Sequence, residues 1–175
     1  LTSSHHIHHM AAKAITFAEV LEFGKDYASQ TIKNAKALAV ALNDFGFKVL
    51  GEKKGFTQSH QVVVNMLDYG DGGKIEADLE KANIIVNRQL IPGDIKAKRN
   101  YMQPGGIRLG SSEITRLGMK ESEMQQIASF IKQVVIDKKD ANGIANEVIE
   151  FRKNYQKTEF CFDNKLGAYE YVKLR

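Results

Sequence analysis

Apolar residues recur at intervals of three and four positions along much of this chain, and this spacing predicts amphipathic α-helices. Gly24 divides the first long apolar stretch into two helices, and Gly46 ends the second of them. Asp140 provides an N-cap for the last helix. The predicted helices cover residues 5–22, 25–44, 73–82, 120–138 and 140–156.

Shorter stretches rich in β-branched and aromatic residues predict strands between these helices. The predicted strands cover residues 47–50, 61–66, 83–86 and a segment around Arg108. Apolar and polar residues also alternate on both sides of residues 164–167. This pattern predicts a hairpin or an extended arm at the end of the chain, over residues 158–175. Helices and strands in this order predict an α+β fold.

The chain has 175 residues, of which 43% are hydrophobic, and this length suffices for one domain with its own core and appended helices. No run approaches the roughly 20 apolar residues that a membrane-spanning helix requires, so we expect a soluble protein. The N-terminal segment lacks the cleavage site of a signal peptide. The single cysteine, Cys161, excludes an internal disulfide, which fits a reducing cytoplasm.

The net charge of +4 results from 25 basic and 21 acidic residues that are scattered along the chain. A loop cluster of Lys96, Lys98 and Arg99 is the best candidate for an anionic partner, although solvated loop charges show the same pattern. Nucleic-acid binding usually requires a concentrated basic face with aromatic residues between the charges. We therefore expect neither a nucleic acid nor a membrane as a partner.

Four histidines lie within residues 5–9, where Ile7 interrupts them. Because Ile7 belongs to the apolar pattern of the first predicted helix, we interpret this segment as native sequence and not as a purification tag. His5 and His9 have the spacing of metal ligands on one helix face, but no acidic or cysteine ligand lies nearby. The sequence therefore predicts no metal site.

Arg108 stands in a short apolar run that is bounded by glycines. In a strand, Ile107 and Leu109 would enter the core, and Arg108 would then face the opposite side. A guanidinium binds a carboxylate through two parallel hydrogen bonds, and neighbouring glycines allow a ligand to come close. Two interpretations fit this spacing: a binding site for a carboxylate, and a solvated arginine on a half-exposed strand.

Residues 105–121 read Gly-Gly-Ile-Arg-Leu-Gly-Ser-Ser-Glu-Ile-Thr-Arg-Leu-Gly-Met-Lys-Glu, which resembles a motif of the serine hydroxymethyltransferase family. Three further segments resemble that family in the same order. They are the Asn-Ala-Lys-Ala core of a long helix at residues 33–39, His60 followed by a hydrophobic strand, and the Ala-Asn-Ile-Ile-Val-Asn run within residues 80–92. Together the four motifs cover most of residues 5–137.

The resemblance implies a pyridoxal-phosphate enzyme of fold type I, the aspartate aminotransferase-like class, that interconverts serine and glycine and transfers a one-carbon unit to a reduced pterin. No lysine of this sequence has the Thr-x-x-Lys setting in which the family forms its Schiff base with the cofactor. We therefore expect the C-terminal part of a glycine hydroxymethyltransferase, without the cofactor-lysine domain and inactive alone.

The same resemblance implies a division of the chain into three parts. We expect residues 1–45 to be a helical connection to the large domain and residues 46–139 to be the small C-terminal α/β domain. In that domain, helices pack on a small, mainly antiparallel sheet. Residues 140–175 are expected to form a C-terminal helix and an extended arm.

Matching positions imply roles in binding for four residues, and we expect no catalytic residue in this part. Arg108 would bind the carboxylate of serine or glycine. Ser3 and Ser4 stand where a Gly-Gly loop of the family contacts the cofactor phosphate of a partner subunit, which implies a homodimer. Gln89 replaces the family's asparagine near the pterin ring. Together with the lysine-rich composition, this replacement favours an archaeal-type enzyme that uses a modified pterin, and the expected co-substrate is tetrahydrofolate or tetrahydromethanopterin.

Two other kinds of protein remain open from the sequence. The small domain of another fold type I enzyme would keep the arginine but would not need the run at residues 83–89. A non-catalytic interaction module would function through its surface alone.

Overall fold

The computed structural model describes residues 6–163, and its longest element is α1 (Ile7–Asp44), one hydrogen-bonded helix of 38 residues. The predicted break at Gly24 is therefore wrong. Glycine weakens a helix by about 1 kcal/mol relative to alanine, but packing on both sides of Gly24 holds the helix together. The ring of Phe23 contacts that of Phe162 at a centroid distance of 5.5 Å, and Tyr27 contacts Phe160 at 5.4 Å.

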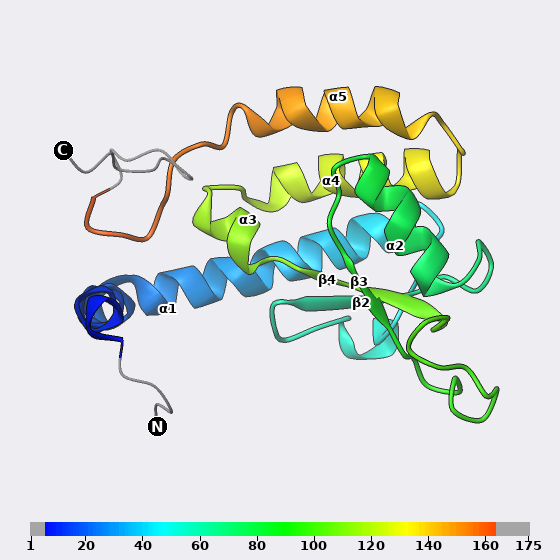
Figure 1. Cartoon of the computed structure of the whole chain (residues 1–175), viewed down its shortest axis with the longest axis horizontal. Coiled ribbons are helices and arrows are strands. Elements are labelled where there is room, and N and C mark those ends of the chain that lie inside the picture. The colour runs from blue at the N-terminus through cyan, green and yellow to red at the C-terminus, as the bar shows by residue number, and fades with distance from the viewer. Residues whose placement is uncertain (1–5, 164–175) are drawn as a thin grey trace.

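The direction of α1 changes near its start, where its first turns are seen end-on while the remainder crosses the view (Figure 1). In this region the hydroxyl of Thr16 donates a hydrogen bond of 2.8 Å to the carbonyl of Ala12. Such bonds to the preceding turn often bend helices. The bend separates a projecting first part of α1 from the part that enters the core.

Four antiparallel strands form a sheet in the order β1-β2-β4-β3. The strands are β1 (Lys48–Val49), β2 (Gln61–Asn65), β3 (Asn87–Gln89) and β4 (Gly106–Gly110). β2 and β4 are the two inner strands. Val62 and Val64 of β2 and Ile107 and Leu109 of β4 are buried, whereas Val63 and Arg108 between them are partly exposed. The short strands β1 and β3 form the two edges.

The remaining helices lie on one side of this sheet. They are α2 (Gly72–Lys81), α3 (Ser112–Arg116), α4 (Glu121–Val135) and α5 (Ala141–Arg152), and a 3₁₀ turn, η1, spans Glu52–Lys54. In Figure 1, α4 lies between α1 and α5, and α2 lies above the strands. The predicted cap is confirmed, since the Asp140 carboxylate accepts a hydrogen bond from the Gly143 amide at 3.0 Å. In the part of the chain described, no helix has the length and apolar character needed to cross a membrane.

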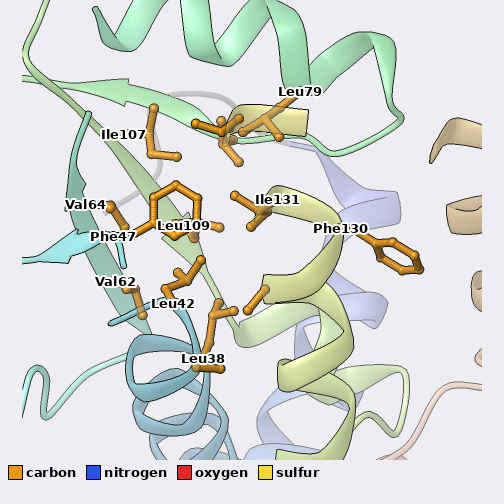
Figure 2. Packing of buried hydrophobic residues seen from close by; sticks show 14 of the residues in the cluster. Leu38, Leu42, Phe47, Val62, Val64, Leu79, Ile107, Leu109, Phe130 and Ile131 are labelled. Carbon is orange, nitrogen blue, oxygen red and sulfur yellow. The ribbon is translucent and has the colours of Figure 1, made fainter. Parts of the chain in front are cut away.

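The core lies between the sheet and these helices, as Figure 2 shows. Fully buried side chains come from every layer, including Leu38 and Leu42 of α1, Val64 of β2 and Ile131 of α4. Polar residues are also buried there, and one of them, Asn34, donates hydrogen bonds of 2.8 Å to the hydroxyl of Thr115 and to the carbonyl of Met119. This amide fixes α1 against the turn between α3 and α4.

Two other elements differ from the sequence prediction. The strand predicted at residues 83–86 is wrong, because β3 begins only at Asn87, where pairing with β4 starts. Ile85 is instead 78% exposed, and Asn83 has a left-handed φ of 59°. Of the predicted C-terminal hairpin or arm, only residues 158–163 are described, and they contain no strand.

Candidate functional site

Arg108 lies at the centre of β4 and faces away from the helices. Ile107 and Leu109 are 0% and 7% exposed in the core, so the alternation of the strand turns Arg108 to the opposite face, where it is half-buried. It stands opposite Val63 of β2 and Asn87 of β3. Within residues 6–163, its guanidinium has no hydrogen-bond or ion-pair partner. A half-buried guanidinium in this state is suited to an anionic ligand.

Gln89 lies on the same face as Arg108. Asn87 pairs with Arg108, so Gln89 is the diagonal neighbour of Arg108 on the adjacent strand, a relationship that places Cα atoms about 7–8 Å apart. The side-chain nitrogen Nε2 of Gln89 donates to the carbonyl of Leu90 at 3.0 Å, and the carbonyl oxygen Oε1 remains as an acceptor. The structure therefore brings two of the predicted site residues together.

A loop of residues 90–105 covers one end of this face. The side chain of Ile91 lies so close to β4 that a Cβ atom on Gly106 would be 2.5 Å from Cγ2 of Ile91. The same atom would be 2.6 Å from the carbonyl oxygen of Val64, which belongs to the backbone of β2. Close packing between three segments therefore requires glycine before Arg108.

Arg88 holds the edge strand that carries Gln89. It points to the other face of the sheet, where its guanidinium forms an ion pair with Glu76 of α2. Glu76 also accepts a hydrogen bond of 3.1 Å from the backbone amide of Arg88. Both side chains are largely buried, and β3 is thereby fastened to α2.

The described residues do not by themselves fit pyridoxal phosphate. The strand residues that share the face of Arg108 are Gln61, Val63, Asn65, Asn87 and Gln89, by register. None of these side chains can form a Schiff base with an aldehyde. Ser3 and Ser4, for which the sequence predicts contact with the cofactor phosphate, lie outside the described residues.

A cleft of about 590 Å³ lies elsewhere, between α1 and the turn from α3 to α4. Lys33, Lys120 and Glu159 are among the residues that line it, whereas Arg108 and Gln89 are not. The face of Arg108 therefore does not belong to this cleft.

Sequence reasoning missed Asp94, which is 2% exposed in the loop beside this face. A buried carboxylate requires compensating hydrogen bonds, and its donors here are backbone amides that no sequence pattern reveals. The available signal was the Pro-Gly-Asp sequence at residues 92–94, which is typical of a turn whose Asp binds nearby backbone.

The fold and this face define the class of protein: the chain is a small C-terminal α+β domain of the fold type I pyridoxal-phosphate enzymes. A solved structure with this fold is the crystal structure of L-threonine transaldolase from Pseudomonas fluorescens in the internal aldimine state, with a TM-score of 0.75 and 34% sequence identity. The similarity covers 87% of this chain and 34% of that chain. The family model for serine hydroxymethyltransferase matches residues 2–131, and the chain belongs to this family.

Curated relatives support the same assignment. The chain is 78% identical over 175 residues to the serine hydroxymethyltransferase of Nitrosopumilus maritimus and 67% identical to that of Cenarchaeum symbiosum. It is 50% identical over 171 residues to the serine hydroxymethyltransferase of Korarchaeum cryptofilum. These matches cover 98–100% of this chain but only 39–40% of the length of the relatives. The predicted resemblance to the archaeal members of the family is confirmed.

Proposed function

We propose that this chain supplies the substrate-binding face of a serine hydroxymethyltransferase that uses pyridoxal phosphate, interconverts serine and glycine, and transfers a one-carbon unit to a reduced pterin. The observation that carries the proposal is the half-buried guanidinium of Arg108, which has no partner among the described residues and stands at the arginine position of the family motif. The chain spans about 40% of the length of its relatives, so the cofactor would be held by residues outside it.

Arg108 would bind the substrate carboxylate through its two parallel N–H groups. This fixes the orientation of the substrate, and fixed orientation is one of the large sources of rate acceleration in enzymes. The bond-breaking chemistry belongs to the cofactor, which the remainder of the protein must place opposite this face.

Gln89 would face the pterin. Its Nε2 donates one of its two N–H groups to the Leu90 carbonyl, and its Oε1 would accept a hydrogen bond from an N–H group of the pterin ring. The pterin would be tetrahydrofolate or tetrahydromethanopterin.

The protein would act as a cytoplasmic homodimer in which Ser3 and Ser4 donate hydrogen bonds to the cofactor phosphate of the partner. Support comes from the first part of α1, where Ile7, Phe17 and Leu21 are 77%, 67% and 89% exposed. Several large apolar side chains exposed on one helix are typical of a surface that a neighbouring segment covers.

Ligand binding and turnover of the full-length enzyme test this proposal. Glycine should bind, whereas glycinamide, which lacks the carboxylate, should bind at least about tenfold more weakly, since each tenfold corresponds to 1.4 kcal/mol. Serine should yield glycine when a reduced pterin is present. Equal binding of glycine and glycinamide, or no formation of glycine with either pterin, would contradict it.

A second candidate is a transaldolase that acts on threonine, because the solved L-threonine transaldolase shares this fold at 34% identity. Both reactions would use the same carboxylate anchor. Product analysis after adding threonine and an aldehyde, with no pterin, separates the two candidates.

A further inference from the structure

The loop of residues 90–105 connects the two binding residues in sequence, since it starts directly after Gln89 and ends shortly before Arg108. Inside this loop lies Asp94, whose exposed fraction is 2%. Burial of a carboxylate is unfavourable unless its oxygens are hydrogen-bonded. The partners of Asp94 therefore show what the residue does.

One oxygen of Asp94 binds both ends of the loop. Its Oδ2 atom accepts a hydrogen bond of 2.9 Å from the Ile91 amide and one of 2.8 Å from the Gly105 amide. The other oxygen, Oδ1, lies 3.8 Å from Nε of Arg99. Hydrogen bonds to an ionised carboxylate are stronger than those between neutral groups. We call this arrangement of Asp94, Ile91 and Gly105 the Asp94 clasp.

The two ends of the loop are not equally secured without the clasp. β4, which follows Gly105, pairs with β2 through five residues and with β3 through three, so Arg108 is held from both sides. β3 is an edge strand of three residues; Arg88 fastens its middle to α2, but Gln89 is its last residue and leads directly into the loop. Loss of the clasp should therefore displace Gln89 far more than Arg108.

We propose that Asp94 is a positioning residue: by clasping the two ends of the loop it holds Gln89 at a fixed place relative to Arg108, and it thereby sets the affinity for the pterin but not for the amino acid. This inference rests on the proposed function. Asp94 lies outside the binding motifs. Its role would be to align the pterin site with the amino-acid site.

The test uses Asp94→Leu and Asp94→Asn in the full-length enzyme. Leucine has the same branched shape, with two methyl groups in place of the oxygens, but no acceptor, whereas the asparagine carbonyl oxygen can accept both amide hydrogen bonds. In Asp94→Leu, hydrogen exchange at the Ile91 and Gly105 amides should accelerate about tenfold or more, as expected for loss of bonds to a charged acceptor. The KM for the pterin should rise about tenfold, while the Kd for glycine stays within about threefold. Asp94→Asn should retain most of both properties.

Two further variants complete the experiment. Asp140→Leu removes a carboxylate that also binds a backbone amide, that of Gly143, but at the start of α5. It should lower stability without changing either affinity. Gly105→Ala places a Cβ atom 2.7 Å from Oδ1 of Asp94 and so opens the clasp from the other side. Gly105→Ala should therefore raise the KM for the pterin as Asp94→Leu does. If Asp94→Leu does not fold, Gly105→Ala decides whether the clasp sets the affinity for the pterin.

Three results would overturn the assignment: unchanged amide exchange in Asp94→Leu, equal losses of glycine and pterin affinity, or an Asp94→Asn variant that behaves like Asp94→Leu. The exchange measurement requires neither substrate nor cofactor. If the wild-type enzyme forms no glycine from serine, the proposed function fails, and the exchange rates still decide whether Asp94 holds the loop.

Discussion

Asn87 stands directly opposite Arg108 in the antiparallel pair of β3 and β4. Because side chains alternate along a strand, this register also places Gln89 on the face of Arg108. A slip of β3 by one residue would turn Gln89 toward the helices. The alignment of the two predicted binding residues thus depends on one short pair of strands.

Arg108→Ala in the full-length enzyme should weaken the binding of serine and glycine by about 2–5 kcal/mol, the range for removing one partner of a desolvated charge pair. Arg108→Lys should restore little of this, since an ammonium lacks the planar fork of the guanidinium. Calorimetric titration measures both effects. Near-normal affinity in the alanine variant would exclude Arg108 as the carboxylate anchor.

Gln89→Asn should change the preference between the two pterins. The amide moves inward by one methylene group, and a misplaced hydrogen bond typically costs about 1–3 kcal/mol. The measurement compares kcat/KM for tetrahydrofolate and tetrahydromethanopterin in the wild type and the variant. If the ratio is the same in both proteins, Gln89 does not set the preference.

Gly106→Ala should destabilise the fold by about 1–3 kcal/mol or more, as overpacking does in a dense core. The added Cβ would be 2.6 Å from the carbonyl oxygen of Val64, and a backbone atom in the neighbouring strand cannot move aside cheaply. Thermal unfolding of the variant and the wild type gives the difference in Tm. An unchanged Tm would show that β2 and β4 are less closely packed than described.

Gly24→Ala should have the opposite effect. α1 is continuous through this position, and a Cβ there would meet the exposed side chain of Val20, with Cγ1 at 3.2 Å. Alanine should therefore stabilise the helix by up to about 1 kcal/mol. A fall in Tm would contradict the continuous helix and support the break that the sequence alone predicted.

The stability of the start of α4 should depend on pH through Glu123. Burial by itself raises the pKa of this carboxyl, but hydrogen bonds from the Lys120 amide and the Ser122 hydroxyl outweigh burial, and the net pKa lies below its usual value of 4.5. A lowered pKa in the folded state means that the stabilisation is present above pH 4.5 and is lost as the pH falls through the lowered value.

Urea unfolding of the wild type and Glu123→Gln from about pH 6 to about pH 3 tests this relationship. The wild type should lose more free energy of unfolding than the variant over this interval. Parallel curves for the two proteins would mean that Glu123 does not contribute.

Much of the fold follows from local patterns in the sequence. The helices α2, α4 and α5 lie within a few residues of their predicted positions, because each has an apolar stripe facing the core and the last has a capping aspartate. The predicted alternation around Arg108 also holds in β4, since Ile107 and Leu109 are buried and Arg108 is not. These features depend on neighbours three or four residues away at most.

The features that escaped prediction depend on distant partners. Residues 83–86 have the β-branched content of a strand, yet β3 begins at Asn87 because the pairing partner, Arg108, is fixed by the register of β4. Asp94 was missed because one of its donors is the amide of Gly105, eleven residues further along the chain. Local propensity contains no information about either partner.

The buried amide of Asn34 also has a consequence for synthesis of the protein on the ribosome. Its partner Thr115 follows it by 81 residues, and the helix that covers the same face of α1 comes later still. At 5–20 residues per second, that interval lasts about 4–16 s. Throughout this time α1 can pack against β1 and β2 but lacks α4, its most extensive partner, so every growing chain passes through a state in which part of this apolar face is uncovered.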